Sequence, residues 1–180
     1  MILLGINDGH DASAALVING KIVGAVQEER IVRKKNISSF PINSIKYLLK
    51  TYNINPKIIE HVCVANKNLQ PLQLWNIYAD FSVNDWHTFQ NFYKNKIYLK
   101  KKQKLNDLFK NYRPKYKLGY NLKNIPFSSD FDKKSKILNK IQKLRIDTIS
   151  KYLKIPDHKI SFFDHHDCHA YYGYYTNVFK

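Results

Sequence analysis

Residues 2–27 have the sequence ILLGINDGHDASAALVINGKIVGAVQ. Three apolar runs in this stretch predict three β-strands, at 2–6, 12–18 and 21–27. Between the second and third runs stands Asn19-Gly20, the strongest two-residue hairpin signal, because a type I′ turn needs a positive φ at both positions. The sequence therefore predicts a β-hairpin lying beside the first strand.

The next segments extend this pattern into an α/β arrangement. Helical spacing of apolar residues predicts an amphipathic helix over 41–52, with Pro41 suited to its start and Asn53 to its end. A β-branched run over 58–65 predicts a buried strand. The resulting order is β-β-β-α-β with mixed strand pairing, which makes the fold class α/β.

The remainder divides into two parts. Residues 66–131 are rich in aromatic side chains and then in lysine, with no strand alternation, and we interpret them as a helical insertion. Apolar residues recurring at threes and fours predict a helix over 136–153, followed by a strand over 160–163 and a helix over 165–175. We therefore expect an amino-terminal part at 1–65, a helical basic insertion at 66–135, and a helix-strand-helix part at 136–180.

Length and composition bound the class of protein. A chain of 180 residues with 44% hydrophobic and 14% aromatic residues can bury a core as about one domain. It has no apolar run of about 18 residues, and its start lacks the features of a signal peptide, so membrane spanning and secretion are not expected. Cys63 and Cys168 stand far apart with no CxxC partner, so neither a disulfide framework nor a cysteine zinc site is predicted. A cytoplasmic location is the resulting expectation.

The net charge of +16 is concentrated in one region. Residues 94–159 hold 20 of the 30 basic and 5 of the 14 acidic side chains. Only four basic residues are arginine, the residue that specific nucleic-acid recognition favours. Three interpretations stay open: a solvated lysine-rich surface, a polyanion-binding surface, or a surface for another partner.

The densest cluster of chemically active side chains is DHHDCHA, residues 164–170. On a helix, His165 and His169 are one turn apart on the same face, so their imidazoles can meet one metal ion. Two histidines are only half of a metal site, and ordinary hydrogen-bonded histidines remain an alternative. The HExxH zinc motif is excluded, because the second position is not glutamate.

Two further polar clusters flank the predicted strands. Residues 5–14 place glycines and small residues in a tight turn whose backbone N–H groups could face an anion, with His10 and Asp11 at its tip. A simple polar hairpin is the alternative. Residues 28–36, EERIVRKKN, follow the third strand and suggest either a solvated strand end or an edge facing phosphate.

Taken together and in order, these clusters resemble a known family. The string GINDGHDASAALVINGKIVGAVQEERIVRKK, the SSFP that follows, and the later FFDHHDCHA are similar to the amino-terminal part of O-carbamoyltransferases. That family includes nodulation, cephalosporin and tobramycin carbamoylating enzymes. The resemblance covers roughly residues 1–65 and 155–175. It implies a ribonuclease-H-like (actin/Hsp70-like) half-domain, similar to that of the universal tRNA threonylcarbamoyladenosine synthase.

The resemblance also implies a reaction. Such enzymes use carbamoyl phosphate and ATP to form carbamoyl adenylate, and then transfer the carbamoyl group to a hydroxyl of a small molecule. The expected cofactors are ATP-derived adenylate and a divalent metal, with iron expected. The implied metal ligands are His165 and His169; His10, Asp11 and Lys35 are the implied catalytic residues; and Gly9, Ser13 and Arg33 are the implied cofactor-binding residues.

The chain also departs from the family pattern. Asn36 stands where the family has histidine, and the 180 residues hold neither the second half-domain nor the carboxy-terminal domain. We therefore expect an incomplete site, inactive alone, whose missing half another chain could supply. Two alternatives are a basic module that binds RNA or another polyanion, and a non-catalytic remnant. Scarce arginine and the lack of an aromatic-basic RNA motif weigh against nucleic acid as a partner.

Overall fold

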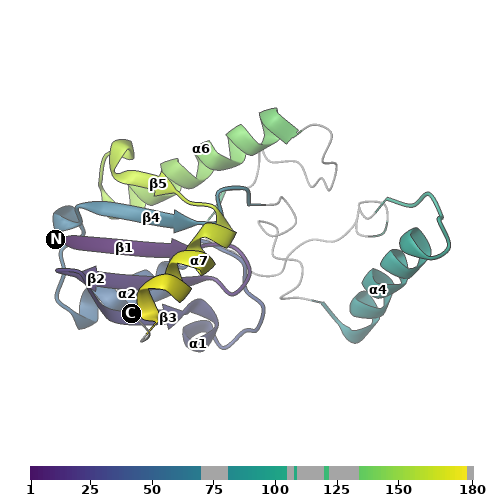
Figure 1. The fold of residues 1–180 in the computed structure, drawn as a ribbon, viewed down its shortest axis with the longest axis horizontal. Helices are drawn as coiled ribbons and strands as arrows, with labels where there is room; N and C mark the ends of the chain where they lie inside the picture. The colour runs from purple at the N-terminus through teal and green to yellow at the C-terminus, as the bar shows by residue number, and fades with distance from the viewer. Residues whose placement is uncertain (70–80, 105–107, 109–119, 122–133, 178–180) are drawn as a thin grey trace.

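The computed structural model describes residues 1–69, 81–104, 108, 120–121 and 134–177. Within them five strands form one sheet in the order β3-β2-β1-β4-β5, as Figure 1 shows. β1, β2 and β3 pair antiparallel, and β4 and β5 extend the sheet parallel to β1. The predicted α/β class with a mixed sheet is confirmed. The strands span Ile2–Asn7 (β1), Ser13–Ile18 (β2), Lys21–Gln27 (β3), His61–Ala65 (β4) and Ile160–Phe162 (β5).

The hairpin between β2 and β3 has the turn that the sequence predicts. Asn19 has φ 49° and Gly20 has φ 78°, so both residues adopt the left-handed conformation of a type I′ turn. The Asn19 side chain also accepts a hydrogen bond of 2.8 Å from the amino group of Met1. The hairpin is therefore fastened to the beginning of β1, its neighbour in the sheet.

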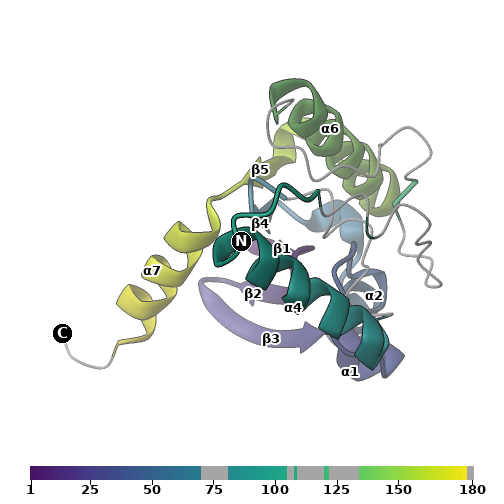
Figure 2. The same cartoon turned by 90° about the vertical axis from the view of Figure 1, so that its right-hand side faces the viewer.

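Helices lie on both faces of the sheet. In Figure 2, α2 (Ile42–Thr51) and α6 (Lys134–Leu153) lie on one side, and α7 (His165–Thr176) lies on the other. The main core fills the space between the sheet and helices α2 and α6. Alternate residues of β1 and β4 point into it, so the residues between them belong to the face beneath α7. Core members include Leu4, Ile6, Leu16, Ile45, Leu48, Val62, Val64, Ile141, Ile149 and Leu153.

The segment after β3 differs from its prediction. A short helix, α1 (Glu28–Val32), replaces the expected solvated strand end, and Glu28 is 2% exposed. Its carboxylate accepts hydrogen bonds from the backbone N–H groups of Asn43 and Ser44, at 3.1 and 2.8 Å. These amides begin α2 and have no partner within that helix. The interpretation as a solvated strand end is wrong for Glu28, because this acidic side chain is buried and caps a neighbouring helix, whereas Arg33 and Lys35 of the same segment are exposed.

The remaining elements are α4 (Val83–Ile97) and two short 3-10 helices, η1 (Pro56–Ile58) and η5 (Asp157–Lys159). α4 begins with a capping box between Ser82 and Asp85, and it lies away from the sheet in Figure 1. It falls within the predicted helical insertion, most of which lies outside the described residues. In the part of the chain that the structure describes, no helix is long and apolar enough to cross a membrane.

Candidate site at the carboxyl edge of the sheet

The three polar clusters of the sequence meet at one edge of the sheet. β1, β4 and β5 run parallel, so their carboxyl ends share an edge, and β3 ends there too because it is antiparallel to β2. The turn at 8–12 follows β1, the segment at 28–36 follows β3, and α7 follows β5. In α/β sheets the carboxyl ends of parallel strands are where ligands bind. Residues far apart in sequence therefore form one candidate site.

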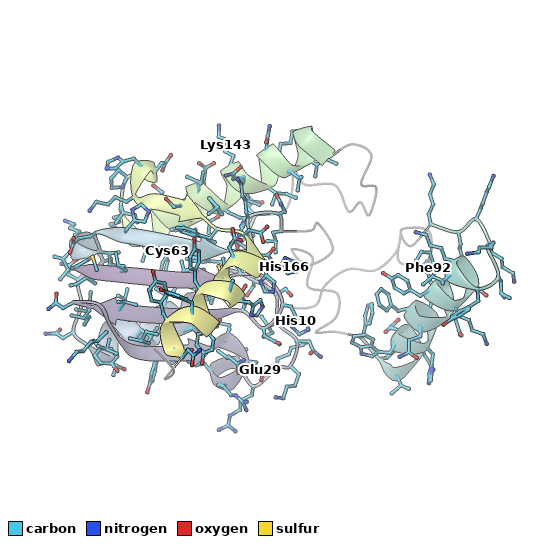
Figure 3. The ribbon with its side chains drawn as sticks, viewed as in Figure 1. His10, Glu29, Cys63, Phe92, Lys143 and His166 are labelled. Carbon is cyan, nitrogen blue, oxygen red and sulfur yellow. The ribbon has the colours of Figure 1, made fainter. Side chains whose placement is uncertain are left out.

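Backbone hydrogen bonds join the first two clusters directly. The N–H of Ala12 donates to Ile37 O at 2.9 Å, and the N–H of Glu28 donates to Ala12 O at 2.8 Å. Figure 3 shows His10, Glu29 and His166, one residue from each cluster, along this edge.

The turn after β1 is held by Asn7. Its side-chain amide donates to the backbone oxygen of His10 at 2.9 Å, and its Oδ1 accepts from the N–H of Gly9 at 3.2 Å. Gly9 is buried, and a Cβ added there would lie 2.3 Å from Nδ2 of Asn66, the residue after β4. The turn is therefore packed closely against the end of β4. Ser13, the third residue after His10, is half-buried where β2 begins.

His10 and Asp11 form a pair at the tip of this turn. His10 Nδ1 lies 2.7 Å from Asp11 Oδ2, and the side chains are 57% and 42% exposed. Asp11 has φ 55°, a left-handed conformation that aspartate tolerates. A carboxylate at Nδ1 favours the tautomer that carries its proton there, which leaves Nε2 with a lone pair. The pair can therefore accept a proton from a group at the open end of the ring.

The segment after β3 supplies cationic side chains. Lys35 Nζ is hydrogen-bonded to Glu29 Oε1 at 2.9 Å, and the ammonium lowers the pKa of Glu29. The Lys35 side chain is 73% exposed, so solvent anions can reach it. Arg33 is also exposed and ends α1 in a left-handed conformation with φ 55°. Lys35 and Arg33 both follow β3, at the carboxyl edge of the sheet.

The third cluster begins α7. Asp164 is its N-cap and accepts a hydrogen bond of 2.8 Å from the N–H of His166, which lowers the pKa of the Asp164 carboxyl. His165 and His169 share one face of the helix, with Nε2 atoms 3.0 Å apart and ring planes at 90°. Both histidines are exposed. The predicted i, i+4 pair of imidazoles is present.

The spacing of these two nitrogens suits a shared metal ion. Metal–imidazole bonds are about 2.1 Å long, and two such bonds at a right angle place the nitrogens about 3.0 Å apart. Two neutral imidazoles are common ligands of divalent transition metals. Among the described residues, no group of three or more histidine, cysteine or acidic side chains is placed to hold an ion. The histidines thus fit two positions of a metal site and leave the others to different ligands.

A groove of about 930 Å³ runs from this edge beneath α7. Its floor is the sheet face with small residues at its centre, where Gly5 pairs with Ala15 on one side and with Cys63 on the other. Phe163 and Tyr172 contribute aromatic walls, and among the described residues of the lining Arg30 is the single charged side chain. Cys63 and Cys168 both line the groove as free thiols, and burial raises the pKa of each.

Sequence reasoning missed three buried polar residues below the turn. Asp8 and Arg145 have no exposed side-chain surface and form an ion pair of 2.7 Å, and Tyr120 donates a hydrogen bond to the same carboxylate. Burial raises the pKa of Tyr120 well above its ordinary value. One signal was available for Arg145: it stands four residues from both Ile141 and Ile149 on the apolar stripe of α6. An arginine on such a stripe needs a buried partner.

Fold and site define an α/β domain that carries a histidine-rich site at the carboxyl edge of a mixed sheet. A family model described as "Carbamoyltransferase N-terminus" matches residues 2–180. The chain therefore belongs to the family of carbamoyltransferase amino-terminal domains. This agrees at family level with the resemblance drawn from the three sequence motifs.

Two curated relatives are similar to parts of the chain. An uncharacterized protein of Synechocystis sp. is 38% identical over 96 residues, which are 51% of this chain and 16% of the relative. An uncharacterized protein of Methanocaldococcus jannaschii is 43% identical over 64 residues, which are 36% of this chain and 12% of the relative. The chain thus matches less than a fifth of the length of either relative.

Proposed function

We propose that this chain forms the histidine-bearing side of an O-carbamoyltransferase site. In the proposed reaction, carbamoyl phosphate, ATP and water yield carbamoyl adenylate, phosphate and pyrophosphate. The carbamoyl group then passes to a hydroxyl of a small molecule, and AMP is released. The family assignment supports carbamoyl transfer in general. The observation that carries the finer proposal, transfer through carbamoyl adenylate, is that the three polar clusters meet at one edge of the sheet.

His10 is the proposed general base for the acceptor hydroxyl. Asp11 lies at Nδ1 and favours a lone pair on Nε2, which is the atom able to accept the hydroxyl proton as the new C–O bond forms. The imidazolium that results would stand next to the Asp11 carboxylate, which favours its charge. The exposure of both side chains leaves room for an acceptor at the ring.

Lys35 is the proposed electrostatic partner of the phosphate groups. Its ammonium can offset the charge of carbamoyl phosphate or of the adenylate phosphate. His165 and His169 would hold the divalent metal, with iron proposed, and the metal would supply further charge stabilisation when bound. Gly9, Ser13 and Arg33 are the proposed contacts to the nucleotide.

The sheet supports a ribonuclease-H-like half-domain as the finer fold proposal. A three-strand antiparallel meander extended by two parallel strands gives one half of the cleft that such a site needs. Both curated relatives are much longer than the matched segments. We propose that the adenine and ribose side of the site is supplied by the part of such proteins that this chain does not match, while Gly9, Ser13 and Arg33 contact the nucleotide from this chain.

The test is a reconstitution. The chain is mixed with a separately produced fragment of the Synechocystis relative that lacks the matched amino-terminal segment. Pyrophosphate release that requires carbamoyl phosphate and ATP is measured, with transfer of a ¹⁴C-carbamoyl label to a panel of hydroxyl compounds. We expect activity in the mixture and none with either component alone, because proximity of both sides supplies much of the rate.

Variants separate the proposed site from the rest of the chain. His10→Asn and Lys35→Met should each lower carbamoyl transfer by about a hundredfold or more. The matched control is His158→Asn, because His158 is an exposed histidine in η5, before the amino end of β5 and at the opposite edge of the sheet. If the mixture with His10→Asn is as active as the mixtures with wild type and with His158→Asn, the proposed role of His10 is overturned.

A further inference from the structure

A fully buried ion pair lies directly beneath the candidate site. Arg145, on α6, donates from Nε to Asp8 Oδ2 and from Nη2 to Asp8 Oδ1, both at 2.7 Å. Neither side chain has exposed surface. The hydroxyl of Tyr120 donates to the same Oδ2. All of these groups lie on the core side of the turn that carries His10.

Arg145 also reaches the ends of β4 and β5, the two strands that run parallel to β1. Its Nη2 donates to the backbone oxygen of Ala65, the last residue of β4, at 3.2 Å, and its Nη1 donates to Lys67 O at 3.4 Å. Its guanidinium carbon lies 4.5 Å from the ring centre of Phe162, the last residue of β5. One side chain therefore contacts the ends of β1, β4 and β5.

These three strand ends lead to the candidate site. Asp8 is two residues before His10, and Phe162 is three residues before His165. The N–H of Lys67 donates to Phe163 O at 2.9 Å, which ties the chain after β4 to the chain that enters α7. Arg145 thus contacts the strand ends that lead to both the His10 turn and the beginning of α7.

Stability alone does not require an ion pair at this position. Removing two charges from water carries a large desolvation cost, and apolar residues of similar volume often replace a buried pair without loss. Arg145 lies on the apolar stripe of α6 between Ile141 and Ile149, where methionine or leucine would pack against the same core. The forked guanidinium instead offers fixed hydrogen-bond directions, which an apolar side chain cannot supply.

We propose that Arg145 and Asp8 form a positioning pair. Arg145 sets the His10–Asp11 turn against the ends of β4 and β5, and through them against the histidines of α7. The inference deepens the proposed carbamoyl transfer, because it names the residues that align the two histidine-bearing segments. Neither residue is catalytic in this account, since both are buried below the site.

The test separates positioning from stability by removing both charges. Asp8→Asn and Arg145→Met alone should each destabilise the fold, because each leaves one buried charge without its partner. The double variant leaves no unpaired charge, and its asparagine keeps an acceptor for the Tyr120 hydroxyl, so its denaturation midpoint should return most of the way to wild type. Lys143→Met, an exposed residue of α6 labelled in Figure 3, is the control.

The positioning readout is amide hydrogen exchange at the turn. In the double variant the N–H groups of Gly9 and Ala12 should exchange about tenfold faster than in wild type, while amides of α2 keep wild-type rates. A role in stability alone predicts wild-type exchange at the turn once the midpoint has recovered. That result in the double variant would overturn the proposal.

Arg145→Lys provides a second variant if the double variant does not fold. Lysine keeps the charge but cannot donate to both carboxylate oxygens and to Ala65 O from a fixed plane. The turn amides should exchange faster in this variant as well, and wild-type exchange would overturn the proposal. In the reconstituted reaction, Arg145→Lys should lower kcat at least about tenfold with little change in KM for carbamoyl phosphate.

The outcomes distinguish this inference from the proposed function. Faster exchange at the turn with no carbamoyl transfer by the wild-type mixture retains the positioning pair and removes the proposed reaction. Carbamoyl transfer by the wild type together with unchanged exchange and kcat in Arg145→Lys retains the reaction and removes the positioning pair.

Discussion

The two histidine-bearing segments of the candidate site, the His10 turn and α7, are built differently. The His10 turn rests on buried polar contacts: Asp8 is paired with Arg145, and Asn7 spans the turn from inside. α7, which carries His165 and His169, has no buried residue, and its tyrosines at 171, 172, 174 and 175 are 58–76% exposed. The difference teaches that the fold fixes one side of the site, while the other is fixed chiefly by its N-terminal contacts.

The largest expected effect lies on the buried side. Glu28→Ala removes the carboxylate that caps α2, leaving two backbone N–H groups and the side chains of Asn43 and Ser44 without their acceptor. We expect a loss of about 3 kcal/mol in the free energy of unfolding, measured by urea denaturation. Asp147→Ala, at an exposed acidic residue of α6, is the control and should cost much less. Equal losses in the two variants would contradict the buried role of Glu28.

On the exposed side, substitutions should alter metal binding and leave the fold unchanged. His165→Ala and His169→Ala each remove one of two neighbouring imidazoles, so affinity for Co²⁺, Fe²⁺ or Zn²⁺ should fall at least about a hundredfold, measured by calorimetry or dialysis. His166→Ala should have a milder effect, and His158→Ala none. Unchanged metal stoichiometry in both His165→Ala and His169→Ala would remove the metal assignment. The melting temperature should not change, because both histidines are exposed.

A smaller effect is expected at the start of α7. The N–H of His166 and other donors hold the pKa of Asp164 below its ordinary value, so its capping contribution is present above about pH 4 and is lost as the pH falls through the lowered pKa. The protection factors of the amides in the first turn of α7 should therefore fall in acid, after the intrinsic pH dependence of amide exchange is divided out. Asp164→Asn, which keeps a cap without a charge, should abolish this pH dependence, and Asp164→Ala should speed exchange severalfold at neutral pH. A pH dependence that persists in Asp164→Asn would assign it to another group.

The smallest expected effect on stability is at Lys35. Its contact with Glu29 is short, but the Lys35 side chain is largely solvent-exposed, and Arg30 Nε, 3.8 Å from Glu29 Oε1, remains as a cationic partner when Lys35 is replaced. The melting temperature of Lys35→Met should match that of wild type within error at physiological salt. A clear destabilisation would show that the segment after β3 depends on this pair, and any loss of carbamoyl transfer would then need a structural explanation.

The sequence predicted the features whose cause is local, and it missed the buried polar contacts between distant residues. Asn19-Gly20, the stripe of α2 and the i, i+4 histidines are local patterns, and each predicted its structure because the cause lies within a few residues. Asp8 and Glu28 stand in polar strings that resemble exposed turns. Their burial depends on Arg145, 137 residues away, and on the amides that begin α2. No local pattern carries such partners.

The family assignment agrees with the resemblance, whose strings cover residues 5–35, 38–41 and 162–170. The three polar clusters, at 5–14, 28–36 and 164–170, lie far apart in sequence. The order β3-β2-β1-β4-β5 explains why these clusters belong together, because it brings the strand ends beside them to one edge. The insertion at 66–135 and the role of its lysines stay predictions, since most of that segment lies outside the described residues.

The most direct test of the central claim is paramagnetic broadening in the NMR spectrum of this chain. Co²⁺, which binds imidazole, is titrated into the ¹⁵N-labelled protein, with a diamagnetic Zn²⁺ titration as reference. If the three polar clusters form one site, Co²⁺ at His165 and His169 will broaden the amides of the His10 turn and of residues 28–36. The amides of the Asn19-Gly20 turn and of His158 will stay sharp. Broadening at the Asn19-Gly20 turn or His158, with a sharp His10 turn, would contradict a shared site at the carboxyl edge.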